Sequence, residues 1–175
     1  MAANLIVKDF GWTRISKELR LMDGSYTKVG FPENAEVKKP SKKIKGEKVA
    51  TDMSEITIVA AFNEFGTSGA KSSRSKGSSM KIPPRPFMST SFDESLEGLN
   101  RLKQKLYIKI INGEITLKQA LSIIGEYMVA KTKKKIRDIK SPPNAPSTIK
   151  KKKSSNPLID SGQMINSVTH TEVLK

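Results

Sequence analysis

Apolar residues recur in the first part of the chain at two different spacings. Four of them lie three or four positions apart and predict an amphipathic helix, namely Trp12, Ile15, Leu19 and Met22. Asp23-Gly24 predicts the end of that helix, because glycine readily adopts the left-handed conformation that closes helices. Residues 26–31 predict a strand that Pro32 ends, and residues 4–8 predict a second short strand by a weaker alternation.

Residues 53–65 fit both periods. The helical period is matched by Ile56, Val59, Ala60 and Asn63, and the strand period by Ile56, Ile58, Ala60 and Phe62. We favour a helix, because Gly66 directly after it is a typical C-terminal stop.

Two longer helices are predicted in the middle of the chain. Residues 82–87 must be extended because of their three prolines, and Ser89 or Thr90 would cap the first helix. Its expected apolar stripe is Phe92, Leu96, Leu99, Leu106 and Ile110, and Asn112-Gly113 would end it. Thr116 and Gln119 form a capping box for the second helix, whose expected buried face is Leu117, Leu121, Ile124, Met128 and Ile136.

The C-terminal segment alternates between loops and short elements. Residues 141–146 predict a loop, 147–150 a further helical turn, and 157–162 a turn. Residues 164–173 predict a closing strand, with Ile165, Val168 and Val173 at its apolar positions. The 175 residues suffice for a single domain spanning 1–175.

Two segments between these elements are almost free of apolar residues. Residues 33–51 and 67–81 are rich in Lys, Ser and Gly, so neither buries enough surface to hold itself in place. They are expected to be flexible basic loops that become ordered, and protected from proteases, when a partner binds.

The formal net charge is +15, and 21 of the 32 Lys and Arg residues fall in segments 38–48, 71–85 and 131–153. One interpretation is a set of solvated surface segments. The other is contact with a polyanion or an acidic surface, and the sequence favours neither. Cations at the end of the helix that includes Lys131 to Lys135 are also favoured by the helix dipole.

Three short runs follow one another along the chain: Asn63-Glu64-Phe65-Gly66-Thr67, Ile82-Pro-Pro-Arg85-Pro86-Phe87 and Pro157-Leu-Ile-Asp160-Ser161-Gly162. In this order, with a helical pair and Pro146-Ser-Thr-Ile-Lys150 between them, they resemble the head–tail joining proteins of tailed bacteriophages, also called tail-completion or neck proteins. The resemblance covers about residues 52–173. It departs from the family at Ser161, where threonine is usual, and at the lysine-rich segment 38–48, which has no counterpart.

The resemblance implies an α+β subunit, with a small antiparallel sheet packed against two to four helices and long basic loops. It implies a structural protein of the virion neck, assembled in the host cytoplasm as a ring of six or twelve copies. Its partners would be the portal-side connector ring, the tail-terminator or tail-tube ring, and non-specifically the DNA in the lumen. The candidate contact residues are Lys42, Lys43, Lys45, Lys71, Arg74, Lys76, Lys150, Lys151, Lys152 and Lys153.

The motif residues have expected structural roles. Glu64 and Arg85 would pair across the loop or a subunit interface, or form an ordinary surface salt bridge. Phe65 and Phe87 would anchor the core on either side of the basic loop. The remaining expectations are positive φ at Gly66 and Gly162, an Asx turn at Asp160, and an extended Pro86.

Enzymatic chemistry finds little support. Cysteine is absent and His170 is the one histidine, so neither a zinc site nor a cysteine nucleophile is expected, and no cofactor is. No P-loop or nucleophile-elbow motif is present. No apolar run is long enough to cross a membrane, and the first residues lack a signal-peptide pattern. The alternatives to a neck protein are a non-specific nucleic-acid-binding protein and a tail-tube terminator.

Overall fold

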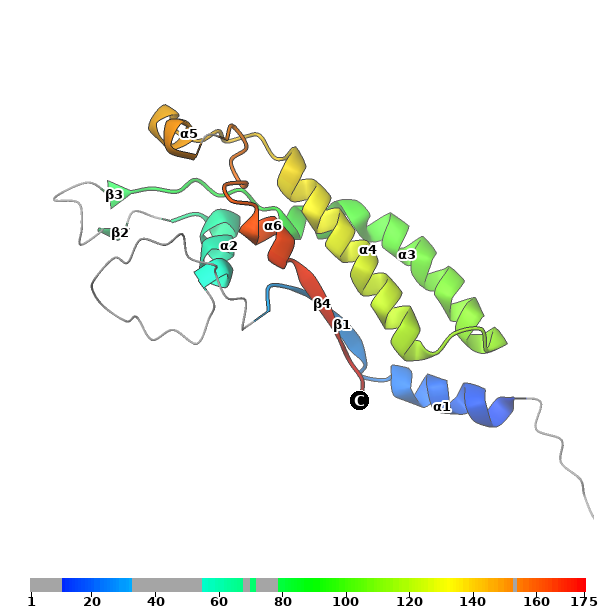
Figure 1. The fold of residues 1–175 in the computed structure, drawn as a ribbon. Coiled ribbons are helices and arrows are strands. Elements are labelled where there is room, and N and C mark those ends of the chain that lie inside the picture. Colours follow the sequence, from blue (N-terminus) through cyan, green and yellow to red (C-terminus); the bar gives the residue numbers. More distant parts are fainter. Residues whose placement is uncertain (1–10, 33–54, 68–69, 72–78, 153) are drawn as a thin grey trace, which may run out of the picture.

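The computed structural model describes residues 11–32, 55–67, 70–71, 79–152 and 154–175 (Figure 1). Two long helices lie side by side and form the body of the molecule, with a two-stranded ribbon against them (Figure 1). The α+β class is therefore confirmed. In chain order the elements are α1 (Trp12–Met22), β1 (Tyr26–Gly30), α2 (Glu55–Phe65), β2 (Ala70–Lys71), β3 (Ser79–Met80), α3 (Met88–Asn112), α4 (Leu117–Asp138), α5 (Pro146–Lys152), α6 (Gln163–Ser167) and β4 (Thr169–Val173).

The helical hairpin of α3 and α4 has the ends that the sequence predicts. Gly113 adopts a φ of 79° and donates its N–H to Ile110. Thr116 and Gln119 form the expected capping box at the start of α4. The predicted stripe of α3 is wrong in its first half, because Phe92 and Leu96 are exposed and Ser91 and Ser95 are buried in their place. Small side chains there let the two helices approach, and Ser91 Oγ lies 3.1 Å from Thr132 Oγ1.

The antiparallel sheet joins strands from opposite ends of the chain. β1 pairs with β4 in a register that places Tyr26 opposite Val173 and Gly30 opposite Thr169, and both strands pack on α4. The predicted closing strand over 164–173 is wrong in its first half, which forms α6. Gly162, at a φ of 80°, is the N-cap of α6 and turns the chain into a helix before β4 begins.

Two hydrophobic clusters occupy the two ends of the helical hairpin. One contains Ile56, Ala60, Phe87, Ile136, Leu158, Met164 and Val168, so it joins α2 and α6 to the start of α3. The other contains Leu106, Ile110, Leu117, Ala120 and Leu121, near the turn between α3 and α4. Two side chains of α1 bind the turn between α3 and α4. Arg14 donates hydrogen bonds to Ile110 O and Ile111 O, and Glu18 accepts the N–H of Leu117.

Helices α1 and α2 confirm their predictions, including the helix favoured over a strand for residues 53–65. A helical turn was predicted at 147–150, and α5 spans Pro146–Lys152. Within the expected loop at 67–81, β2 and β3 pair antiparallel over two residues each, so this segment is not wholly loop. The predicted strand at 4–8 and the expected loop at 33–51 lie outside the described residues.

Candidate assembly interface at the motif corner

The three sequence motifs meet at one place, where α2 ends and α3 begins. We call residues 63–67, 82–89, 142–144 and 156–162 the motif corner. Side chains and backbone groups from all four segments are joined there by hydrogen bonds across 13 to 59 positions of the sequence.

Glu64 is the centre of the corner and is 8% exposed. Its Oε2 accepts the backbone N–H groups of Phe87 at 2.8 Å and Met88 at 2.9 Å. Its Oε1 accepts the N–H of Ser89 at 3.0 Å and the Ser89 hydroxyl at 2.7 Å. A carboxylate is favoured there by the positive end of the helix dipole. The predicted cap at Ser89 or Thr90 is therefore wrong, because α3 begins at Met88 and Glu64 caps it from another helix.

Arg85 binds a different set of partners and is 4% exposed. Its Nε donates to Pro142 O at 2.7 Å, and its Nη2 donates to Pro143 O at 3.3 Å and to Asn144 Oδ1 at 3.2 Å. Desolvation by burial lowers the pKa of Arg85 from its usual value. The predicted pair of Glu64 with Arg85 is wrong, since the two buried side chains bind separate backbone segments within the subunit.

Gly66 has the positive φ predicted for it, at 72°. Its position is also crowded, because a Cβ there would lie 2.8 Å from Ile82 O. The next residue fixes the two motifs to one another: Thr67 N–H donates to Ile82 O at 2.9 Å, and Ile82 N–H donates to Thr67 Oγ1 at 3.0 Å. Gly162 also has the expected positive φ.

The two motif phenylalanines have opposite environments. Phe87 is fully buried and its ring meets that of Phe31 edge to face, at 6.2 Å between centroids, which confirms it as a core anchor. Phe65 is 80% exposed, so the same prediction is wrong for it. The reason is helical geometry: α2 turns Ile56, Ala60 and Glu64 inward, and the next side chain points away from that face. Pro86 is exposed within the extended segment.

The Asx turn of this segment forms at Asn156, not at Asp160 as predicted. Asn156 Oδ1 accepts the N–H of Leu158 at 3.0 Å, while its Nδ2 donates to Arg137 O at 2.9 Å. Asp160 is exposed and contributes to a cavity instead. The Asn-Pro dipeptide at 156–157 was the sequence signal for this turn.

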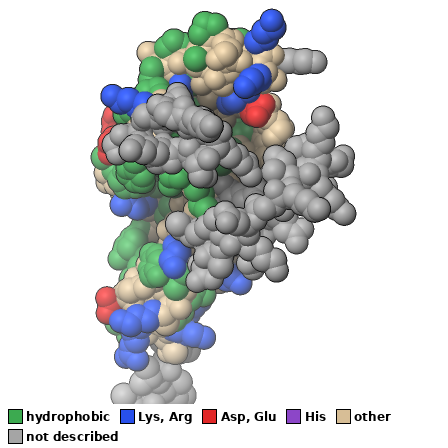
Figure 2. Space-filling view, turned by 90° about the vertical axis from the view of Figure 1, so that its left-hand side faces the viewer, with side chains coloured by type: hydrophobic (Ala, Val, Ile, Leu, Met, Phe, Trp, Pro, Cys, Tyr) green, Lys and Arg blue, Asp and Glu red, His purple; other side chains and the backbone are tan. Residues whose placement is uncertain are grey.

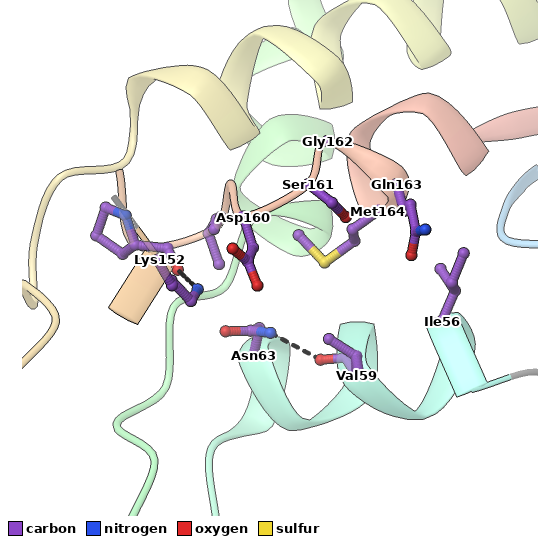
Figure 3. Close-up of a pocket in the computed structure, with 11 residues that line it drawn as sticks. Ile56, Val59, Asn63, Lys152, Asp160, Ser161, Gly162, Gln163 and Met164 are labelled. Atoms are coloured by element: carbon purple, nitrogen blue, oxygen red, sulfur yellow. Dashed lines mark hydrogen bonds between the residues drawn. The ribbon is translucent and has the colours of Figure 1, made fainter. Parts of the chain in front are cut away.

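A cavity of about 320 Å³ lies between α2 and the turn that precedes α6 (Figure 3). Ile56, Val59 and Asn63 face it from α2, and Asp160 and Met164 face it from the opposite segment (Figure 3). The side chain of Asn63 is held by Val59 O at 2.8 Å.

Beside this cavity α2 presents an apolar surface to solvent. We call Val59, Phe62 and Phe65 the α2 face; all three are exposed. Aromatic side chains exposed together on one short helix are typical of protein–protein contacts, where they contribute most of the binding energy. The motif corner holds this face at a fixed angle to α3.

The predicted basic contacts are only partly covered by the described residues. Lys42, Lys43, Lys45, Arg74, Lys76 and Lys153 lie outside them, and Lys71 lies in β2. Lys150 and Lys151 are exposed on α5, whereas Lys152 Nζ donates to Pro157 O of the motif corner at 3.4 Å. On the side shown in Figure 2, the basic side chains form separate groups among hydrophobic and uncharged ones.

His170 is half-buried on β4 against α4. Its Nε2 lies 3.3 Å from Ser122 Oγ and 3.2 Å from Glu172 Oε1. A hydrolytic triad needs the base to contact serine and carboxylate through different nitrogens, so this arrangement is not one. The pKa of Glu172 is lowered by a hydrogen bond from its own backbone amide, then by Ser122 and by His170. No sequence pattern predicts this contact, because α4 and β4 are far apart along the chain.

Within the described ranges, no cluster of three or more His, Cys, Asp or Glu side chains is placed to hold a metal ion. Among the helices described, none combines the length and the apolar character that a membrane span needs. No protein family model, curated protein or solved structure matches this chain.

Proposed function

We propose that this protein is a structural component of the neck of a tailed bacteriophage, where copies form a ring that joins the DNA-filled head to the tail. The observation that carries the proposal is the motif corner. The three runs on which the resemblance to neck proteins depends are far apart in sequence, yet hydrogen bonds connect them. Glu64 joins the first run to the second, and Arg85 of the second run binds Asn144, whose amide donates to Pro157 O of the third. The three runs are therefore parts of a single structural device.

The device suits assembly because it presents the α2 face. A closed ring of identical subunits needs two different surfaces that fit each other, and at least one of them is usually apolar. Val59, Phe62 and Phe65 provide such a surface, and the cavity beside them provides a recess next to it. We propose that the α2 face contacts the next subunit of a ring of six or twelve copies.

Basic side chains would contact the DNA and the neighbouring rings. Lys150 and Lys151 are exposed on α5, which projects from the end of the molecule (Figure 1). Lysine is a hydrated point charge on a flexible stem, so it attracts the DNA backbone or acidic partner rings without sequence preference. Such weak contacts are compatible with DNA moving through a neck channel.

The test is negative-stain microscopy of lysates from a phage in which this gene is disrupted. DNA-filled heads beside complete, unattached tails are the expected result. Normal virions would contradict a structural role and leave the nucleic-acid-binding alternative. Filled heads with tails of abnormal length would assign the protein to tail termination instead. Supplying the intact gene from a plasmid is the control, and it should restore joined particles.

A further inference from the structure

A second recess lies between the first two turns of α3 and the last two of α4. We call it the α3–α4 recess. Its volume is about 160 Å³, and it is lined by Ser91, Glu94, Ser95, Lys131, Lys134, Lys135 and Asp138. None of these residues belongs to the motif corner or to the candidate contacts predicted from the sequence.

The hydroxyl of Ser95 is the unusual group in this recess. Ser95 is only 4% exposed and lines the recess, and no hydrogen-bond partner for its hydroxyl is found in the described part of the chain. Ser91, one turn earlier, donates to Met88 O at 2.8 Å and contacts Thr132. Among the described residues no buried side-chain nitrogen or oxygen lacks a partner, so the Ser95 hydroxyl is reached from the recess, where it can donate to a ligand.

Three lysines converge on the same recess because they lie at i, i+3 and i+4 along α4. Lys131 Nζ lies over the ring of Tyr127, 5.1 Å from its centroid. The tyrosine hydroxyl in turn fills the space above Gly98 on α3, where a Cβ would overlap it. This contact positions Lys131. The helix dipole favours cations in the last turn of α4, but it does not explain why these lysines line the same recess as the Ser95 hydroxyl.

Two carboxylates share the recess with the lysines. Glu94 pairs with Lys135, and Asp138 lies at the rim. Three ammonium groups and two carboxylates leave one net positive charge, which matches the charge of a phosphodiester. A bound anion would compete with Glu94 for Lys135, and the exposed Glu94 side chain is free to move toward solvent.

We propose that the α3–α4 recess binds a phosphate group, with Lys131, Lys134 and Lys135 as cationic donors and Ser95 as the neutral donor. Ammonium groups and a hydroxyl are the donors that proteins use for phosphate oxygens. The phosphate belongs either to a nucleic-acid backbone or to free phosphate, since both present the same oxygens. The site does not depend on the proposed neck role.

The experiment measures two ligands with the full-length protein: a short fluorescein-labelled DNA duplex by anisotropy, and inorganic phosphate by calorimetry. Ser95→Ala leaves the net charge unchanged and is expected to weaken binding about tenfold. The double variant Lys131→Gln/Lys134→Gln should weaken it further. The control is the double variant Lys103→Gln/Lys105→Gln, which removes the same two charges from a part of α3 outside the recess. It should weaken binding much less.

Glu94→Gln gives a prediction of opposite sign, because it removes the competing carboxylate, and binding should tighten severalfold. Glu97→Gln is the matched control, since Glu97 pairs with Arg101 outside the recess. If Ser95→Ala weakens only duplex binding, the phosphate is that of a nucleic acid. If it weakens only phosphate binding, the ligand is free phosphate.

The proposal is overturned if Ser95→Ala changes neither affinity and the two lysine double variants bind alike, because bulk charge would then explain all binding. The unmodified protein gives a check that does not depend on any variant folding. Amide resonances of residues 91–95 and 131–138 should shift on titration with phosphate, and shifts confined to other regions would also overturn the site.

Discussion

Glu64 caps α3, which begins at Met88, by accepting the backbone N–H of Phe87, 23 positions later in the chain, at 2.8 Å. The same carboxylate accepts two further N–H groups and the Ser89 hydroxyl. The Asn-Glu-Phe-Gly and Ile-Pro-Pro-Arg-Pro-Phe motifs are therefore complementary, since one contains the acceptor and the other leads into the donors. This relationship fixes the direction of α2, and hence of the α2 face, relative to α3.

Replacing the carboxylate should destabilise the fold. Glu64→Gln keeps the size of the side chain but removes the charge that serves four donors, so we expect a loss of about 2 kcal/mol in the free energy of unfolding. Urea titration followed by circular dichroism measures it. The control Glu97→Gln, on the exposed surface of α3, should change stability by less than about 0.5 kcal/mol. Equal effects of the two substitutions would contradict the capping role.

Arg85 should not tolerate lysine. Arg85→Lys preserves the charge but cannot supply donors to Pro142, Pro143 and Asn144 at once, so we expect about 2–3 kcal/mol of destabilisation. Arg101→Lys is the matched control, because Arg101 forms an exposed pair with Glu97 and should be nearly neutral. Thermal unfolding compares them. A neutral Arg85→Lys would mean that only the charge matters at this position.

Gly125 allows β4 to approach α4, because a Cβ there would overlap the His170 ring and lie 2.9 Å from His170 Cβ. Gly125→Ala should therefore cost about 1–3 kcal/mol despite the better helix propensity of alanine. In a His170→Ala background the cost should fall, since only the Cβ contact remains. A double-mutant cycle on unfolding free energies measures this coupling. Additive effects would show that the contact with His170 is not the cause.

The lowered pKa of Glu172 predicts a pH dependence of stability. A carboxyl whose pKa is lower folded than unfolded stabilises the fold above its ordinary pKa, which is 4.5, and this contribution is lost as the pH falls through the folded value. As the pH is lowered beneath 4.5, the urea concentration at the unfolding midpoint should therefore decrease more steeply for the native protein than for Glu172→Gln. Glu97→Gln serves as the control and should retain the native slope. Parallel curves for all three proteins would exclude a contribution from Glu172.

Phe65 and Phe87 should separate assembly from folding. Phe65→Ser removes an exposed side chain and should leave the unfolding temperature nearly unchanged. If the proposed ring forms through the α2 face, the same substitution should prevent the subunit from assembling. Phe87→Ala empties a buried site and should cost about 3–5 kcal/mol. Complementation of the disrupted phage gene, with each variant's thermal melt measured alongside, tests both. Full complementation by Phe65→Ser would remove the α2 face from the assembly interface.

Local signals in the sequence predicted much of the secondary structure. The capping box of Thr116 and Gln119, the left-handed stops at Gly66 and Gly113, and the α2 helix involve interactions within a few positions of the chain. Such interactions depend on neighbouring residue types alone, so the pattern is sufficient to place them. The three prolines at 83–86 likewise restrict their own backbone.

Tertiary structure decided which motif residue has which partner. Sequence spacing cannot show that Glu64 caps α3 while Arg85 binds residues 142–144, because these contacts close loops of 23 to 59 positions. The two phenylalanines are equally apolar in the sequence, but the face of α2 that packs inward leaves Phe65 exposed, whereas Phe87 lies in the hydrophobic cluster with Ile136. Burial and long-range hydrogen bonding are properties of the assembled fold, and for that reason they determined the motif corner, the α2 face and the α3–α4 recess.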